Sequence, residues 1–436
     1  MNISNSYNEN ENNSLFNREI DKSFKQDKNN LKIREDNKTR IDLIDYNLRN
    51  QLKYNFFIQH KESTNKRNLG LDFGRILAIF FIINHHIIFH GGPLFKTKVL
   101  SLENNILIFL NTIFCSGVNI FGMISGFVGF HSHKFSNLFY LTFETFFYNF
   151  GIALFLKKIN VGKVNDLIAF IFPLFISDYW YFNAYFTMYF FLPLINKGIK
   201  SMEKKEMGIF NLSLFLLFSC FGQIKHYSKR FNKDFFFFVN GFTYMWLIIL
   251  YFYGSYFGRF EKEFIYKSKY LFYFINYLIL IFFACLRSLI IIYKIVNHLN
   301  GNKMTVEYTS PSLVIISICF INILSHLEIK NTFLTKNVTF FSPLTYGIYL
   351  IHNHKLVRNY IIKNNYLWLI KKNNNSFLLI IKEIFESFKI FFFCSIIDYI
   401  RLLLFKLFKI KQICNILEHL QKKILNNIIF FFENYY

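Results

Sequence analysis

The sequence predicts an all-α membrane protein, a polytopic bundle of about ten transmembrane helices. Hydrophobic residues make up 53% of the 436 residues, and the mean hydropathy is +0.26, which is far from the average of a water-soluble chain. Apolar runs such as residues 75–89 and 270–286 recur along the chain with polar breaks between them. Several of these runs approach the ~20 residues that a helix needs to cross a bilayer.

The net charge is also informative about partners. The formal net charge is +23, partly because lysine and asparagine are frequent almost everywhere in the chain. For a chain this apolar, the basic surplus favours contact with anionic lipid headgroups and argues against nucleic acid as a partner. The six cysteines are scattered without a CxxC spacing, so we expect them to be core or lipid-facing residues.

The chain divides into three parts. Residues 1–68 form a polar tail rich in Asn and Lys, which we expect to be disordered because it lacks the apolar content to bury a core. Residues 69–410 hold eleven apolar segments and form the membrane domain. Residues 411–436 form a basic and aromatic C-terminal tail. The fourth segment, which begins near residue 164, is short and carries Pro173, so it need not span the membrane.

Basic residues at both ends of the membrane domain predict its orientation. Lys66 and Arg67 precede the first helix, while Lys406 and Lys409 follow the last. By the positive-inside rule, both termini face the cytoplasm. This requires an even number of spans, so we predict about ten crossings plus one short segment.

The first helix carries the densest set of ionisable residues, namely Asp72, Arg75, His85, His86 and His90. At ~100° per residue, Arg75 and His86 lie within about 20° of each other on one helix face and ~16 Å apart along the axis. Ionisable groups inside a membrane are costly, so each is a candidate site residue. One interpretation is an Arg that binds an anionic donor and a His that acts on an acceptor hydroxyl. The other is an interfacial Asp–Arg pair and a buried His bonded to a neighbouring helix.

Other candidates have simpler structural interpretations. In the second helix Gly122 and Gly126 favour close helix packing, although Ser125 offers a hydroxyl. Tyr179 and Trp180 start the fifth segment, as is typical of an aromatic belt at the membrane interface.

The remaining intramembrane charges do not indicate a second site. Asp398 and Arg401 stand three residues apart on one helix and are expected to pair. Glu144 and Arg287 have no obvious partner in the sequence.

The histidine pairs argue against a metal site. His131 and His133, and likewise His352 and His354, form HxH pairs without a third ligand at metal spacing, and HExxH occurs nowhere. A P-loop, a GxSxG elbow and a dinucleotide fingerprint are also absent from the sequence.

Taken in order along the chain, the segments resemble the acyltransferase 3 family of membrane acyltransferases, especially the branch from low-GC bacteria that O-acetylates cell-surface polysaccharides. The resemblance covers roughly residues 69–410 and rests on five motifs in family order. They are "LDFGRILAIFFIINHH", "GVNIFGMISGF", "YWYFNAYFTMYFFLPLIN", "YFYGSYFG" and "YGIYLIH".

The resemblance implies transfer of an acyl group, usually acetyl from acetyl-CoA at the cytoplasmic side, to a hydroxyl of a glycan or lipid-linked saccharide. Arg75 and His86 fall on the family's functional Arg and His, with Arg75 and Lys134 as donor-binding candidates. The supporting candidates are Asp72, His85, Ser125, Trp180 and His352. The family often carries several basic residues after its second helix, whereas "HSHKFSNLF" here offers few.

Two questions stay open at this point. His86 could act as a general base or carry the acyl group itself. Two other functions are also compatible with the sequence. One is a secondary transporter that uses the same charged face as a substrate or proton path, and the other is an inactive membrane scaffold.

Overall fold

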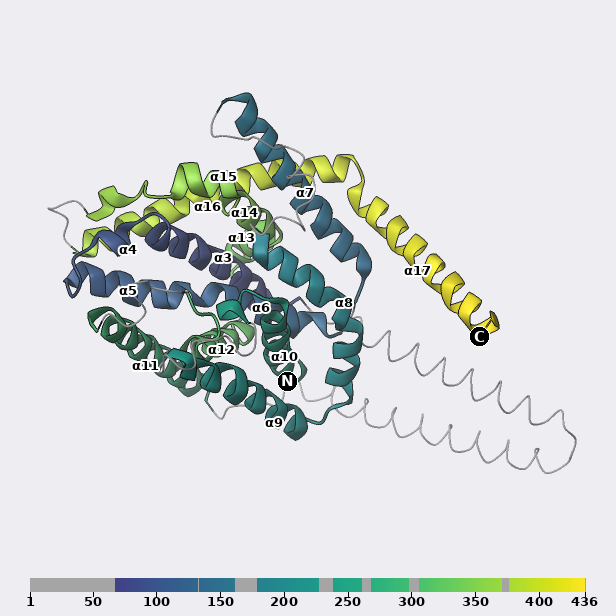
Figure 1. The fold of residues 1–436 in the computed structure, drawn as a ribbon, viewed down its shortest axis with the longest axis horizontal. Coiled ribbons are helices and arrows are strands. Elements are labelled where there is room, and N and C mark those ends of the chain that lie inside the picture. The colour runs from purple at the N-terminus through teal and green to yellow at the C-terminus, as the bar shows by residue number, and fades with distance from the viewer. Residues whose placement is uncertain are drawn as a thin grey trace, which may run out of the picture. The chain divides into compact units, whose positions relative to one another are not determined.

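The computed structural model describes residues 67–131, 133–160, 179–226, 238–260, 268–297, 306–370 and 376–435. This part of the chain is helical and contains no strand, so the predicted all-α fold is confirmed (Figure 1). The polar tail up to residue 66 and the fourth apolar segment near residue 164 lie outside the described residues.

The described residues form fifteen α-helices. In chain order they are α3 (Leu69–Phe89), α4 (Pro93–Lys96), α5 (Leu102–Phe114), α6 (Ser116–Gly129), α7 (Phe135–Lys158), α8 (Trp180–Ser201), α9 (Lys204–Leu214), α10 (Tyr244–Phe260), α11 (Lys269–Val296), α12 (Pro311–Ser325), α13 (Thr332–Phe341), α14 (Thr345–His352), α15 (Lys355–Val357), α16 (Ser376–Leu407) and α17 (Ile410–Tyr435).

Short 3₁₀ and π segments connect some of the α-helices. They are η4 (Phe215–Cys220), η5 (Phe221–His226), η7 (Val239–Gly241), η9 (Ser342–Leu344), η10 (Arg358–Ile362) and η11 (Leu367–Ile370).

Polar residues between the apolar runs set the helix starts. The side chains of Asn68, Ser101 and Asn331 accept hydrogen bonds from backbone N–H groups in the first turns of α3, α5 and α13. Pro311 occupies the first turn of α12, where its missing N–H costs no helical hydrogen bond. The polar breaks that divide the sequence into segments therefore also cap the helices.

Within the described residues, five stretches are long and apolar enough to cross a membrane. They are Leu69–Lys96, Leu102–Gly129, Phe135–Lys158, Lys204–Gln223 and Lys269–Val296. The first two are 72% buried within the protein over their most apolar window, whereas Lys269–Val296 is 28% and Lys204–Gln223 is 11% buried. The number of crossings, about ten, stays a prediction.

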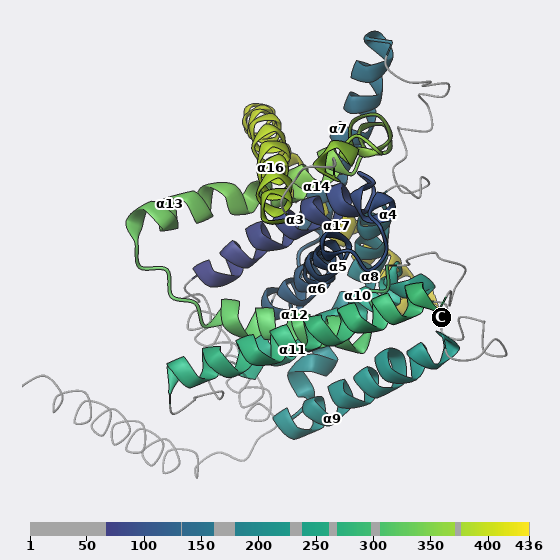
Figure 2. The ribbon, with the colours of Figure 1, turned by 90° about the vertical axis from the view of Figure 1, so that its left-hand side faces the viewer.

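The interior of the bundle is built around α3 and α6. Helix α6 packs against α3 on one side and α10 on the other, and α16 lies against α3 (Figures 1 and 2). A Cβ added to Gly126 would overlap the backbone carbonyl of Tyr251, and one added to Gly117 would lie 2.6 Å from the carbonyl oxygen of Ala78. The glycines of the second helix are thus needed for close packing, as the sequence indicated.

A buried charge cluster ties α16 to α7. Arg401 Nη2 lies 2.7 Å from Asp398 Oδ2 and 2.9 Å from Glu144 Oε1, which confirms the expected Asp–Arg pair and supplies a partner for Glu144. The hydroxyl of Tyr148 donates to Asp398 Oδ1 at 2.7 Å. Gly347 of α14 packs directly against this carboxylate, because any Cβ there would overlap it.

Candidate active site

A cavity of about 50 Å³ lies in the middle of the bundle. Helices α3, α6, α8 and α14, together with Tyr308 ahead of α12, contribute its walls. The lining residues are Ile82, His86, Val118, Phe121, Trp180, Tyr181, Tyr308, Tyr346, Tyr349 and Asn353. A mostly apolar and aromatic hollow with a few convergent polar groups is the usual form of a small-molecule site.

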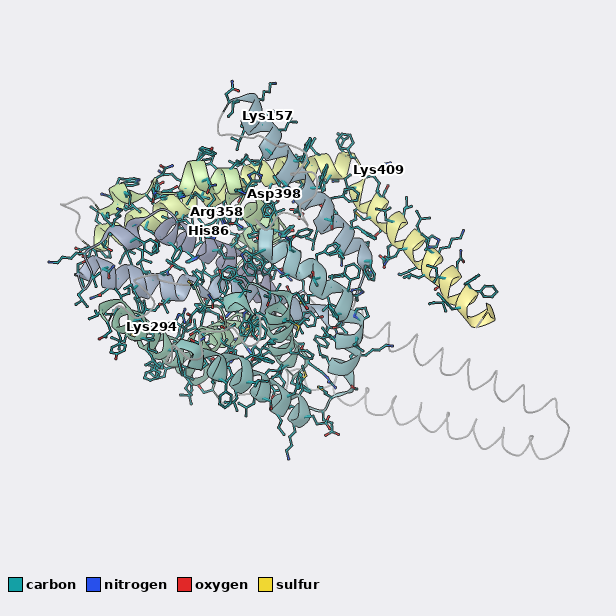
Figure 3. All side chains as sticks on the ribbon, in the orientation of Figure 1. His86, Lys157, Lys294, Arg358, Asp398 and Lys409 are labelled. Carbon is teal, nitrogen blue, oxygen red and sulfur yellow. The ribbon has the colours of Figure 1, made fainter. Side chains whose placement is uncertain are left out.

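His86 is the imidazole that α3 contributes to the cavity wall. Figure 3 labels its position in the bundle. Its side chain is 9% exposed. Its Nδ1 atom has no hydrogen-bond partner within the described part of the chain. A buried polar atom without a partner is costly, so it marks a position where a ligand atom could bind.

His352 of α14 faces His86, with 5.1 Å between the ring centroids. Its Nδ1 atom donates to the carbonyl oxygen of Ile348 at 2.6 Å, because a carbonyl can only accept. In the neutral ring this places the lone pair on Nε2, which is buried and has no partner among the described residues. Two imidazoles from different helices thus present unpartnered nitrogens in one region.

His85 occupies a different environment. Its Nδ1 atom lies 2.7 Å from Asn111 Oδ1 and 3.4 Å from Cys115 Sγ. The interpretation of a buried histidine bonded to a neighbouring helix therefore applies to His85 and not to His86. His90, one turn beyond His86, packs against it edge to face, with ring centroids 5.1 Å apart.

Asp72 and Arg75 form the expected ion pair at the opposite end of α3, with 2.5 Å between Oδ1 and Nη1. The hydroxyl of Ser342 also donates to Asp72 Oδ1, at 3.0 Å. Asp72 is buried, whereas the Arg75 side chain is 30% exposed. The carboxylate is thus fixed from two elements, and the guanidinium keeps surface that an anion could contact.

A line of tyrosines along α8 connects the two ends of α3. Tyr185 lies within electrostatic range of Arg75. The ring of Tyr181 stacks 6.4 Å from Tyr185 and lies 6.0 Å from Tyr349 of the cavity wall. Trp180 stacks on Tyr308 at 5.6 Å inside the cavity. Trp180 and Tyr181 at the start of α8 therefore line the cavity, and the position of Trp180 in an aromatic belt stays a prediction.

The other two candidates lie outside the cavity. Ser125 donates to the carbonyl of Phe121 one turn earlier and does not line the cavity. Lys134 is exposed ahead of α7, and its backbone oxygen accepts from the hydroxyl of Tyr189 at 2.6 Å. Tyr189 is a ring neighbour of Tyr185, so Lys134 lies toward the Arg75 end of the tyrosine line.

Sequence reasoning missed Asn353 and Arg358. Asn353 lines the cavity directly after His352, and its Oδ1 accepts a hydrogen bond from Arg358 Nη1 at 3.2 Å. Arg358 acts electrostatically on His86 and His352 but has no carboxylate partner among the described residues. Both residues follow the "YGIYLIH" segment. The signal in the sequence was an Asn one residue after the candidate His352 and an Arg six residues after it.

The described residues contain no group of three or more His, Cys, Asp and Glu side chains arranged to hold a metal ion. The model of the acyltransferase 3 family, which describes an acyltransferase domain, matches residues 68–395. The chain belongs to this family. No curated protein and no solved structure matches it. The matched range includes every residue that lines the cavity and excludes α17.

Family membership and the apolar helices together identify an integral membrane acyltransferase. The ring of His86, on the helix that opens the family domain, lies at the cavity of this acyltransferase, and the ion pair of Arg75 lies toward the other end of the same helix.

Proposed function

We propose that this acyltransferase transfers an acetyl group from acetyl-CoA to a hydroxyl of a glycan or lipid-linked saccharide, and that His86 performs the central step. The observation that carries the proposal is the unpartnered Nδ1 atom of a buried histidine at the wall of the central cavity. A neutral imidazole in such a place can take up a proton or attack a thioester.

In the general-base route, an imidazole nitrogen takes the proton of the acceptor hydroxyl as its oxygen attacks the thioester carbonyl. The carbon–sulfur bond then breaks, and the CoA thiolate leaves with the proton from the imidazolium. His352 supports this route, because its Nε2 lone pair is also free of a partner within the described chain and close to the His86 ring.

In the acyl-carrier route, a nitrogen of His86 attacks the thioester and an acyl-imidazole forms as the CoA thiolate leaves. The acceptor hydroxyl then attacks this acyl group, and the lone pair of His352 Nε2, in the ring beside His86, would accept the hydroxyl proton. Rapid quenching with labelled acetyl-CoA in the absence of acceptor distinguishes the two routes. Label on His86 supports the carrier, and unlabelled protein supports the general base.

The Arg75 end of α3 suits the anionic part of the donor. The exposed portion of the Arg75 guanidinium can bind a phosphate, and Lys134 adds a second cation on the same side. Arg75 and His86 are ~16 Å apart along the helix. A donor with its phosphates near Arg75 would therefore extend its thioester arm along the tyrosine line to reach His86.

Arg358 and Asn353 could stabilise the negative charge that develops on the thioester carbonyl oxygen during transfer. A guanidinium only donates, so the Asn353 atom that faces Arg358 is the oxygen and its amide N–H₂ is left for other contacts. In a cavity with little water, a donor of this kind and a nearby unpaired cation stabilise a tetrahedral oxyanion.

The proposal is tested with membranes that contain the protein and acetyl-CoA labelled in the acetyl group. We expect label in a saccharide or lipid-linked saccharide fraction, and its loss in His86→Ala membranes with equal amounts of inserted protein. Label that accumulates inside sealed vesicles without covalent attachment would instead indicate transport. Absence of transfer to any hydroxyl-bearing fraction would contradict the proposal.

A further inference from the structure

Helix α17 is an element that the acyltransferase domain does not account for. It begins after the end of the family match at residue 395, and at 26 residues it is long enough to cross a bilayer. It is nevertheless not among the helices whose apolar content suits a span. Figure 1 shows that it leaves the bundle beyond the end of α16, with its C-terminal end away from the other helices.

The first turns of α17 are fixed to the membrane domain. Cys414 is fully buried, and Glu418 Oε2 accepts a hydrogen bond from the backbone N–H of Ser136 at 3.2 Å. Ser136 lies in the first turn of α7, where unpaired N–H groups and the helix dipole favour a carboxylate. Lys422 completes this anchor with an ion pair to Glu418 at 2.9 Å.

Helix α17 carries an exposed apolar face. Ile416, Leu420, Ile424 and Ile428 are all exposed. Their spacing of four residues places them on one side of the helix at ~100° per residue.

The opposite side of α17 is polar and basic. Lys411, Asn415, Lys422 and Asn426 lie around the direction opposite to the apolar face. Lys409 precedes the helix in a left-handed conformation with φ of 54°, which turns the chain sharply out of α16. Figure 3 places Lys409 at this corner.

We propose that α17 lies in the interface of the leaflet in which α7 begins, with its apolar face among the acyl chains and its lysines among anionic phospholipid headgroups. An interfacial helix has an apolar face, basic residues on the opposite side, and too low a hydropathy to cross the bilayer. Helix α17 has all three features. Glu418 fixes α17 to Ser136 at the start of α7, a stretch long and apolar enough to cross a membrane, and this brings α17 to the membrane surface. Lysines near an anionic membrane surface strengthen such binding.

The test uses the full chain in vesicles of phosphatidylcholine with and without phosphatidylglycerol. A photoreactive benzoylphenylalanine replaces Ile424 or, as the matched control on the polar side of the same helix, Asn426; both side chains are exposed. We expect protein–lipid adducts, detected by mass spectrometry, from position 424 and several-fold fewer from position 426. The yield at position 424 should rise with phosphatidylglycerol.

A second comparison isolates the charges. Replacing Lys411 and Lys423 with Gln, which leaves the Glu418–Lys422 anchor intact, should remove most of the dependence on phosphatidylglycerol. Equal lipid adducts from positions 424 and 426 overturn the proposal. Cross-links from position 424 to a second copy of the chain also overturn it, because they identify the apolar face as a protein interface.

Discussion

Arg401 on α16 and Glu144 on α7 form a buried ion pair, with 2.9 Å between Nη2 and Oε1. Asp398 shares the same guanidinium, so one cation serves two carboxylates. This cluster lies behind α14, the helix that carries His352, and Tyr346 of α14 also contacts Thr145 of α7 at 2.6 Å between hydroxyls. Helix α14, which carries His352, is therefore fixed by packing against charged residues that do not line the cavity.

Arg401→Ala should destabilise the protein by about 3–5 kcal/mol, because it leaves two carboxylates buried without their cation. The measurement is thermal unfolding in detergent. The triple variant Glu144→Gln, Asp398→Asn and Arg401→Met, which removes all three charges, should be considerably more stable than Arg401→Ala alone. Equal stability of the two variants would show that the charges are not coupled.

His86→Ala should lower acyl transfer by about 10²–10⁴-fold, the contribution of a positioned acid or base, while the protein remains folded. His85→Ala should have a smaller effect on transfer, because His85 contacts Asn111 and Cys115 instead of the cavity. Transfer is measured with labelled acetyl-CoA, normalised to inserted protein. A near wild-type rate for His86→Ala would refute its central role.

Arg358→Gln should reduce the rate of transfer at least about tenfold, since it removes a cation whose charge acts on both unpartnered imidazoles. Lys363→Gln is the matched control, with the same change of charge at an exposed position five residues later. Equal losses in both variants would indicate a general effect of surface charge rather than a role at the cavity.

Gly126→Ala should prevent correct packing of α6 on α10, because the new methyl group overlaps the backbone of Tyr251. Gly151→Ala is the control, because a Cβ at this position in α7 contacts nothing within 4 Å. There the substitution should stabilise by up to about 1 kcal/mol through helix propensity. Thermal unfolding of both variants in detergent provides the comparison.

Arg75→Lys should keep the positive charge but lose bidentate geometry toward a phosphate, and with it much of the transfer activity. The decisive quantity is the KM for acetyl-CoA, which should rise. A normal KM for the donor together with a lower maximal rate would place the donor phosphates elsewhere.

Much of this architecture could be predicted from local pattern. The apolar runs predicted the helices, and the 11-residue separation of Arg75 and His86 correctly placed them toward opposite ends of α3. The different environments of His85 and His86 also follow from the ~100° step between neighbouring residues. These features depend only on helix geometry within one segment.

Tertiary contacts could not be predicted in this way. The interfacial interpretation of Trp180 used the position of an aromatic residue at a helix end, but Tyr308 from a distant segment stacks on it within the cavity. In the same way, Glu144 has its partner on α16, and Asn353 becomes significant only because Arg358 and the cavity lie on either side of it. A single sequence contains no record of which helix faces pack together.

The apolar helices differ in how much of their surface is buried within the protein. The helix with His86 is 72% buried over its most apolar window, whereas Lys204–Gln223 is only 11% buried. The less buried helices therefore have the most apolar surface available for lipid, whereas the helix with His86 is enclosed by other helices. Changes in the length or fluidity of the lipid acyl chains should therefore change the positions of α9 and α11 in the membrane more than they change the distance between His86 and His352.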